Sequence, residues 1–474
     1  MKPGKVLLVR LFEPVPFVYT TPPTGFLYVA SSLFHAYPGL LMKLYDFSLP
    51  VHDETLFQKT VRSFQPDTVL FSGTYVERDQ LFRASAIVRS ELPQALIIAG
   101  GAGPSSSPLE FASSPNIDYI ITGEGEERLP ALFRHLESGS KPPDGLGFIK
   151  DGSVFYTPPE SFITDLDSLA FPQWSLLDLP AYSKVGAMNG VLKYEPYATV
   201  VSSRGCPFDC SYCHKTMGRV FRPRSPQSVV SEIMALVRQH GVREIHFIDD
   251  CFNLDPERAK EICRLIIASG IEISIAFPNA VKGDLLDEEL IVLLKKAGCF
   301  SMTVAVESAS AKIRSLMNKR LDLRRLEQNT RILDRLNIYT TAYFIFGLPG
   351  ESEKQMTASR KFACRLPIDS IAFFRFIPFP GTAIRDRFFS HINYTGIPSR
   401  SFEYFSASED FNLSRVSTKS LKRFSYLTYL HFYFSIRRIA GLWRKYPKTW
   451  RTLKAFPMEI VEFIHRFVHP RDRS

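Results

Sequence analysis

Three cysteines stand close together in the middle of the chain, within the sequence Arg-Gly-Cys-Pro-Phe-Asp-Cys-Ser-Tyr-Cys of residues 204–213. Cys206, Cys210 and Cys213 directly follow an apolar stretch that predicts a strand. Thiolates are soft ligands that suit iron–sulfur clusters or zinc. Three thiolates at the carboxyl end of a strand can hold three irons of a 4Fe–4S cube and leave the fourth iron open to a small molecule. The pattern therefore predicts a reactive metal cluster.

A structural zinc site is the alternative interpretation of these thiols. Such a site takes four ligands, and a fourth is not obvious in the sequence. His214 adjoins Cys213 too closely to be an easy ligand, and Cys251 could serve only if the fold brought it near. A non-catalytic zinc protein that binds nucleic acid or a membrane therefore stays open as a function of another class.

Length and composition set the frame for this site. The chain has 474 residues, of which 45% are hydrophobic and 22% are charged, so more than one folded domain is expected. No apolar run reaches the ~20 residues that a membrane-spanning helix needs, and the first residues lack a signal-peptide core. Seven cysteines in a chain of this size favour reduced thiols or metal ligands over disulfides. We expect a cytoplasmic protein.

The positive charge of the chain is confined to its end. Residues 415–474 hold 14 Lys and Arg against 3 Asp and Glu, together with 12 aromatic residues, whereas the rest of the chain is close to neutral. Basic, aromatic helices can pack on a neighbouring domain or lie on an anionic bilayer. Nucleic acid is the weakest interpretation, since no recognition module is evident. Packing on a folded domain of the same chain and peripheral contact with a membrane both stay open.

The first part of the chain alternates short apolar runs with amphipathic stretches. This alternation predicts a Rossmann-like, doubly wound parallel sheet in residues 1–141. Residues 142–196 are rich in Pro, Gly, Asp and Ser and predict a linker with little regular structure. The predicted strands are 5–11, 41–47, 67–72, 95–99 and 118–122, and the predicted helices are 27–36, 79–91 and 126–136.

A second alternation of strands and helices begins after the linker. Its six strands are too few for an eight-unit barrel, so residues 197–410 predict a partial (β/α)6 TIM-like barrel. Residues 411–474 form the predicted helical, basic tail. The six predicted strands are 198–203, 244–249, 272–277, 301–307, 340–346 and 370–377.

The spacing of the cysteines, Tyr212 before the third of them, and their place after a first barrel strand resemble the radical S-adenosylmethionine (SAM) superfamily. The resemblance implies that the open iron binds the amino and carboxylate groups of SAM. It also implies that an electron from the reduced cluster cleaves SAM to a 5′-deoxyadenosyl radical. Tyr212 would lie against the adenine.

Further strand ends carry residues that this resemblance places at SAM. An acidic pair after the second strand would accept a hydrogen bond from the SAM ammonium group. An acid at the end of the fourth strand would contact the ribose, with a serine beside it, and a Gly-Leu-Pro-Gly segment after the fifth strand would pass close to the adenine. These residues are Asp249 and Asp250, Glu307 and Ser308, and Gly347 and Pro349.

A Rossmann-like domain before such a core resembles the cobalamin-binding subfamily. Glycine-rich strand ends would let the backbone approach a flat ligand and its nucleotide tail. The Asp-x-His-x-x-Gly signature is missing, and residues 11–20 hold no histidine, so cobalamin is expected without a histidine ligand from this loop. The candidate cobalamin residues are Ser72, Gly73, Thr74, Gly100, Gly101, Gly123, Glu124 and Gly125.

These features predict an enzyme that methylates an unactivated carbon with a 4Fe–4S cluster, SAM and cobalamin. A carbon of that kind has no acidic proton, so acid–base catalysis alone cannot open its C–H bond. A radical cyclase or rearrangement enzyme, resembling the anaerobic magnesium-protoporphyrin ester cyclase, is the alternative within the same family. The expected partners are a small-molecule substrate, hydrophobic if the tail presents it, and an electron donor such as flavodoxin or ferredoxin.

Overall fold

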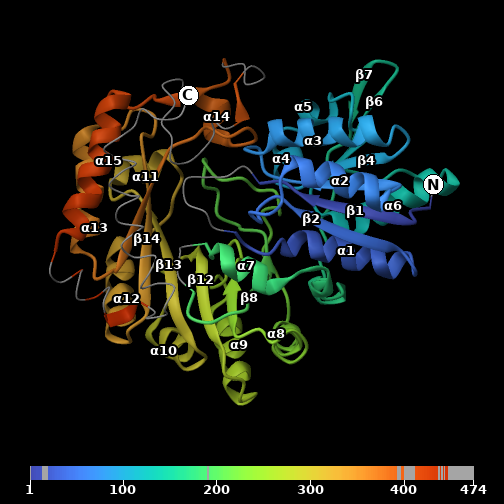
Figure 1. Cartoon of the computed structure of the whole chain (residues 1–474). Helices are drawn as coiled ribbons and strands as arrows, with labels where there is room; N and C mark the ends of the chain where they lie inside the picture. The colour runs from blue at the N-terminus through green and yellow to red at the C-terminus, as the bar shows by residue number, and fades with distance from the viewer. Residues whose placement is uncertain are drawn as a thin grey trace.

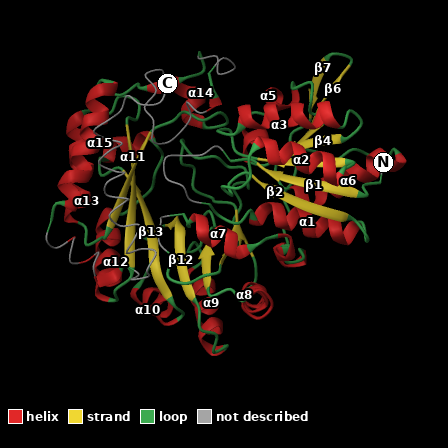
Figure 2. Cartoon of the chain, viewed as in Figure 1, coloured by secondary structure: helices red, strands yellow, loops and turns green. Residues whose placement is uncertain are grey.

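Two sheets lie side by side in the computed structural model of the chain, the first in its blue to teal part and the second in its green to orange part (Figure 1). The structure describes residues 2–12, 20–188, 192–391, 397–399 and 411–435, together with residues 438, 441 and 444–446. Figure 2 shows each sheet flanked by helices, with loops between the two sheets. None of the described helices combines the length and apolar character that crossing a membrane requires.

The first sheet has seven strands in the order β2-β1-β3-β4-β5-β6-β7. Strands β1 to β5 are parallel, and β6 and β7 extend the sheet as an antiparallel hairpin. The strands are β1 (Lys5–Arg10), β2 (Leu41–Asp46), β3 (Thr68–Ser72), β4 (Leu96–Gly100), β5 (Tyr119–Ile121), β6 (Leu146–Lys150) and β7 (Ser153–Tyr156). The helices are α1 (Thr24–Ala36), α2 (Glu54–Phe64), α3 (Arg78–Glu91), α4 (Ala102–Ser106), α5 (Pro108–Ala112) and α6 (Gly125–Ser138).

Strand β1 is buried on both faces of this sheet. Val6 and Leu8 pack in a core with residues of α1 and α6, whereas Leu7 and Val9 pack in a second core with residues of α2 and α3. A strand covered on both sides needs a continuous apolar run, which is what the sequence provides here. The predicted doubly wound α/β domain is confirmed.

The segment between the two domains differs from its prediction. Residues 146–156 form the β6–β7 hairpin, which continues the first sheet where the sequence predicted little regular structure. Short, mostly exposed strands of this kind leave only a weak apolar pattern in the sequence. The remaining connection contains the short helices η1 (Leu166–Ser168), η2 (Trp174–Leu176) and α7 (Leu179–Val185).

The second sheet has six parallel strands in the order β15-β14-β13-β12-β11-β8. Their spatial order follows the chain, so the predicted partial (β/α)6 barrel is confirmed. The strands are β8 (Tyr197–Val200), β11 (Glu244–Phe247), β12 (Ser274–Val281), β13 (Cys299–Glu307), β14 (Tyr339–Phe346) and β15 (Ser370–Arg375). The helices are α8 (Pro226–His240), α9 (Pro256–Ala268), α10 (Glu288–Lys296), α11 (Ala311–Leu316), α12 (Leu323–Arg335), α13 (Glu353–Arg365) and α14 (Ala383–Phe388).

The barrel helices begin where the sequence supplies a capping side chain. A serine or aspartate at the N-cap accepts hydrogen bonds from backbone N–H groups of the first turn, which satisfies donors that have no partner inside the helix. These capping residues are Ser225 for α8, Asp255 for α9, Asp287 for α10, Ser310 for α11 and Asp322 for α12.

Helix α15 (Thr418–Tyr433) covers the open edge of the barrel at β15. Phe424 lies against Phe346 of β14, and the Tyr429 hydroxyl accepts a 3.0 Å hydrogen bond from the backbone N–H of Phe373. The Arg438 guanidinium donates to backbone carbonyls at the end of α13. The described part of the tail therefore packs on the barrel and lends no support to the membrane interpretation. Residues 447–474 lie outside the described part.

Candidate functional site

The three cysteines lie on one loop, residues 205–221, which we call the cluster loop. Two short antiparallel strands, β9 (Ser203–Arg204) and β10 (Arg222–Pro223), form its neck, with Arg204 in register with Arg222. A Cβ atom on Gly205 would lie only 2.2 Å from the carbonyl oxygen of Val220, and Gly205 has a φ of +80°. Only glycine therefore lets the two ends of the loop approach each other here.

Contacts with the barrel hold the cluster loop at the carboxyl ends of the strands. The backbone N–H of Ser211 donates to the carbonyl of Met317 over 2.9 Å, and its carbonyl accepts from the N–H of Ile384 over 2.9 Å. The Asn318 side chain donates to the carbonyl of Asp209. The loop is thus fixed between the turn after α11 and the start of α14.

The electrostatics of the loop disfavour bare thiolates. Burial, followed by the charges of Cys210 and Asp250, raises the pKa of the Cys213 thiol to about 12. Burial is also the largest cause that raises the pKa of Cys206. Metal binding removes protons from thiols and stabilises the resulting thiolates. A cationic centre would therefore supply what these cysteines lack.

The arrangement of the thiols fits a cluster better than a single ion. In the described part of the chain, no three Cys, His, Asp or Glu side chains converge closely enough to ligate one metal ion. A mononuclear zinc site needs that convergence. A cube spreads its thiolate ligands over different irons, so three cysteines on one loop fit a 4Fe–4S cluster without meeting at a point.

Tyr212 and Glu307 come together beside the cysteines. The Tyr212 hydroxyl donates a 2.9 Å hydrogen bond to Oε1 of Glu307, and Nζ of Lys319 lies 3.5 Å from the same oxygen. Burial, and then the charge of Glu307, raise the pKa of Tyr212 well above its usual value. Glu307 ends β13 with a φ of +62°, a strained conformation for a residue other than glycine. Their contacts with adenine and ribose stay predictions.

The two acids after β11 have different environments. Asp249 is buried and accepts hydrogen bonds from the hydroxyls of Ser202 and Ser203, at 2.7 and 2.6 Å, and from the Ser202 backbone N–H. Asp250 is exposed and accepts a 3.1 Å hydrogen bond from the backbone N–H of Gly205. Asp249 thus joins the end of β11 to the start of β9 and the residue before it, and Asp250 accepts from the start of the cluster loop.

The remaining candidates for SAM lie on the next two strand ends. The Ser308 hydroxyl is buried and lies 3.2 Å from that of Ser359 on α13. The backbone N–H of Gly347 donates to Oε2 of Glu351 over 2.9 Å, and Pro349 is buried in the same turn. The sequence did not single out Glu351. Glu351 is only four residues from Gly347 in the chain, and this short separation could have indicated a contact between them.

The cobalamin candidates occupy three adjacent strand ends of the first sheet. The segments after β3 and β4 are joined by a 2.9 Å hydrogen bond from the N–H of Gly103 to the carbonyl of Gly73. The Ser105 hydroxyl accepts a 3.0 Å hydrogen bond from the N–H of Gly123, which joins the segment after β5. Partly exposed backbone at the carboxyl ends of parallel strands fits a flat, nucleotide-bearing cofactor. Residues 13–19 of the first loop lie outside the described residues.

The side chain of Glu124 makes a different contact from the predicted one with cobalamin. It is buried and accepts hydrogen bonds from Arg204 and Arg222, at the neck of the cluster loop. Arg204 lies two residues before the first cysteine, but the sequence pattern assigns no function to it or to Arg222. Lys319 was also missed. The positive charges of the two arginines, close in sequence to the three cysteines, are the feature from which the sequence could have indicated a role for them.

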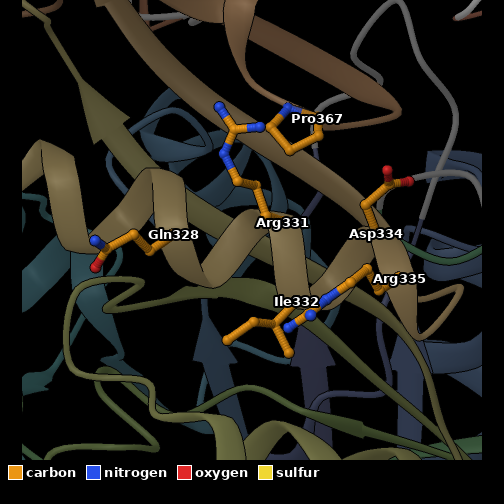
Figure 3. Close-up of a pocket in the computed structure, with 6 residues that line it drawn as sticks. All are labelled: Gln328, Arg331, Ile332, Asp334, Arg335 and Pro367. Carbon is orange, nitrogen blue, oxygen red and sulfur yellow. The ribbon is translucent and has the colours of Figure 1, made fainter.

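Two hollows of the described surface can be compared with these strand ends. One of about 510 Å³ lies on the outside of α12 and is lined by Gln328, Arg331, Ile332, Asp334, Arg335 and Pro367 (Figure 3). None of the candidate residues lines it, so we assign it no part in the chemistry. A smaller hollow of about 280 Å³ lies between α4–α5 and residues Pro380 and Gly381.

Sequence comparison finds two families in the chain. Residues 200–363 match the radical SAM superfamily and residues 15–133 match the B12 binding domain. An uncharacterized methyltransferase of Pyrococcus horikoshii is 28% identical over 77% of this chain and 78% of the relative. The anaerobic magnesium-protoporphyrin IX monomethyl ester cyclase of Cereibacter sphaeroides is 28% identical over 70% of this chain and 55% of the relative.

Structural comparison finds the same fold. The radical SAM methyltransferase TsrM of Kitasatospora setae, solved with cobalamin and a 4Fe–4S cluster, superposes with a TM-score of 0.65. The match has 19% identity and covers 80% of this chain and 73% of that one. The two family matches account for both domains and for their order, and together with the similarity to curated enzymes they set the non-catalytic zinc protein aside. The chain belongs to the radical SAM enzymes that carry an N-terminal B12-binding domain.

Proposed function

We propose that this enzyme is a cobalamin-dependent radical SAM methyltransferase that acts on an unactivated carbon of a small molecule. The observation that carries the proposal is the cluster loop. It presents Cys206, Cys210 and Cys213 after the first strand of a six-stranded parallel barrel, and ionic contacts join it to the B12-binding domain. Similarity to methyltransferases over most of the chain supports this choice.

The chain contributes binding, orientation and exclusion of water. When bound, the cluster with SAM supplies the one-electron chemistry that opens a C–H bond, and cobalamin supplies the methyl group. The three cysteines would hold the cluster. Glu307, Tyr212 and the backbone at Gly347 would orient SAM, with Asp250 better placed than Asp249 to accept from its ammonium group, because Asp249 is already satisfied by two serines. Strand-end backbone of the first domain would hold cobalamin.

The products of SAM identify the reaction. We expect the anaerobically purified, reconstituted and reduced enzyme to contain ~4 iron per chain. With substrate it should release 5′-deoxyadenosine together with S-adenosylhomocysteine, measured by mass spectrometry. A Cys206→Ser, Cys210→Ser, Cys213→Ser variant is the control and should lose both the iron and the products. Wild-type protein that forms neither product, or that lacks iron, would rule the proposal out.

A radical cyclase is the second candidate. The magnesium-protoporphyrin IX monomethyl ester cyclases match about seven-tenths of this chain at 27–28% identity. A cyclase or rearrangement enzyme transfers no methyl group to its substrate. The same experiment would then yield 5′-deoxyadenosine without S-adenosylhomocysteine.

The free cysteines and the need to reduce the cluster bear on the compartment and on the electron donor of the enzyme. All seven cysteines are free, and free thiols persist in reducing compartments. We infer a cytoplasmic enzyme that takes its electrons from a small reductant such as flavodoxin or ferredoxin. Reduction of the cluster by either protein, followed by its visible absorbance under anaerobic conditions, tests this inference.

A further inference from the structure

One carboxylate of the B12-binding domain reaches both strands at the neck of the cluster loop. Oε1 of Glu124 accepts a 2.8 Å hydrogen bond from Arg204 and a 2.9 Å hydrogen bond from Arg222, and Oε2 accepts a further 2.8 Å hydrogen bond from Arg222. Oε2 also accepts from the backbone N–H of Ile163 over 2.7 Å. Glu124 is the N-cap residue of α6, at the end of the short segment that follows β5.

The two arginines of the neck carry like charges, so the neck needs a carboxylate close to them. Arg204 and Arg222 are register partners in the β9–β10 pair, and each guanidinium side chain is only 5% exposed. Two buried positive charges side by side repel each other, and burial weakens the screening of that repulsion. Glu124 places a negative charge between them, and Glu126 pairs with the second arm of Arg204 over 2.6 Å.

The neck in turn sets where the loop lies. Arg222 also donates to the carbonyl of Met217 within the loop over 2.7 Å. Gly205 follows Arg204, Val220 lies two residues before Arg222, and the backbones of Gly205 and Val220 are in close approach. A change in the spacing of the two strands would therefore move Cys206 first, since it is two residues from Arg204.

We propose that Glu124 is a positioning residue that holds the cluster loop closed from the cobalamin-binding domain. It fixes the loop on the same segment that carries Gly123 and Gly125, two of the predicted cobalamin residues. The two cofactor sites would thereby share one rigid connection. The idea that Glu124 connects two cofactor sites rests on the proposed function. The contacts of Glu124 with Arg204 and Arg222 do not depend on that function.

The structure offers a matched control in a second buried ion pair, which lies within the barrel domain and meets the first domain only through the hydroxyl of Tyr28. Glu232 of α8 accepts from Arg224 and from the hydroxyl of Tyr28 on α1. Its carboxylate is as buried as that of Glu124. Arg224 lies beyond β10 and outside the cluster loop. Loss of this carboxylate should reduce stability without loosening the loop.

Hydrogen exchange of the cluster loop tests the proposal. We would compare Glu124→Gln, Glu126→Gln, Glu232→Gln and the wild-type holoenzyme under anaerobic conditions by mass spectrometry. In E124Q we expect peptides within residues 205–221 to exchange about tenfold faster or more, the range for loss of hydrogen bonds to charged groups. E126Q should show a smaller increase, because only one arm of Arg204 loses its partner, and E232Q should show none.

A second readout follows the cluster itself. The electron paramagnetic resonance spectrum of the reduced cluster should change in E124Q and stay as in the wild type in E232Q. If E124Q does not fold, the comparison of E126Q with E232Q decides the question. Exchange in residues 205–221 that is equal in these variants and the wild type would overturn the proposal. Absence of iron from the wild type would instead count against the proposed function, and the same exchange comparison would then be made on the iron-free forms of all four proteins.

Discussion

The hydroxyl group of Tyr212, the residue before the third cysteine, donates a hydrogen bond of 2.9 Å to Oε1 of Glu307 at the end of β13. The two residues are far apart in the chain and come from different barrel units. Glu307 adopts a left-handed backbone conformation after a shift in the pairing of β13 with β14. Strain of this kind persists where the surrounding contacts impose it.

Removal of this hydroxyl should impair the use of SAM. Tyr212→Phe keeps the ring and deletes a hydrogen bond to a charged group, so we expect the rate of 5′-deoxyadenosine formation to fall about tenfold. Iron content should stay unchanged, because the cysteines are untouched. Tyr194→Phe, at a half-exposed tyrosine, is the control and should behave as the wild type. A Y212F enzyme with the wild-type rate would show that the contact is not needed.

The sequence predicted the strands that are apolar throughout and the residues at their carboxyl ends. β1 is apolar over nearly its whole length because both faces are covered, and the cysteine spacing is a local pattern. Contacts between distant segments could not be predicted in this way. Nothing local to Glu124 distinguishes a carboxylate that faces a cofactor from one that pairs with Arg222, because the choice depends on how the two domains pack.

The same limit explains the tail. Its basic and aromatic residues fit a bilayer surface as well as a protein surface, since both bury apolar side chains and leave charges at the rim. The structure uses Tyr429 and Tyr433 to satisfy backbone N–H groups of the edge strand β15. That need follows from the open barrel, which is a property of the whole domain.

Loss of either tyrosine hydroxyl should weaken this closure. Tyr429→Phe leaves the backbone N–H of Phe373 without its 3.0 Å partner, so we expect destabilisation of about 1 kcal/mol. The thermal midpoint of the anaerobic protein would fall accordingly. Lys422→Gln, on the exposed face of the same helix, should leave the midpoint unchanged. An equal midpoint for Y429F and the wild type would contradict the proposed closure of the edge.

Glu351 should make stability depend on pH. Burial raises its pKa from 4.5 to about 8, although the N–H groups of Gly347 and Leu348 donate to it. Between these two values the folded chain binds a proton that the unfolded chain releases. The free energy of unfolding should therefore fall as pH rises from about 4.5 to about 8, by at most about 1.4 kcal/mol per pH unit.

The neutral variant Glu351→Gln isolates this contribution. Chemical unfolding at pH 5.5 and at pH 8.5 should show the variant gaining stability relative to the wild type at the higher pH. Glu353→Gln, two residues further on and exposed, is the matched control and should shift both values together. A difference between E351Q and the wild type that does not change with pH would mean that Glu351 is ionised in the fold.

Gly205 should be the glycine on which the cluster loop depends. Its φ of +80° and that of Gly152, in the β6–β7 turn at +74°, impose a similar backbone cost on alanine. A Cβ atom at Gly152 would meet nothing within 4 Å, whereas at Gly205 it would lie 2.2 Å from the Val220 carbonyl oxygen. Gly152→Ala should therefore cost about 1 kcal/mol of stability, and Gly205→Ala should cost more and also open the neck.

We expect G205A to lose most of its iron after anaerobic reconstitution while G152A keeps the wild-type amount, as measured by iron and sulfide content. Equal iron in both variants would show that the close approach at the neck does not control assembly of the cluster.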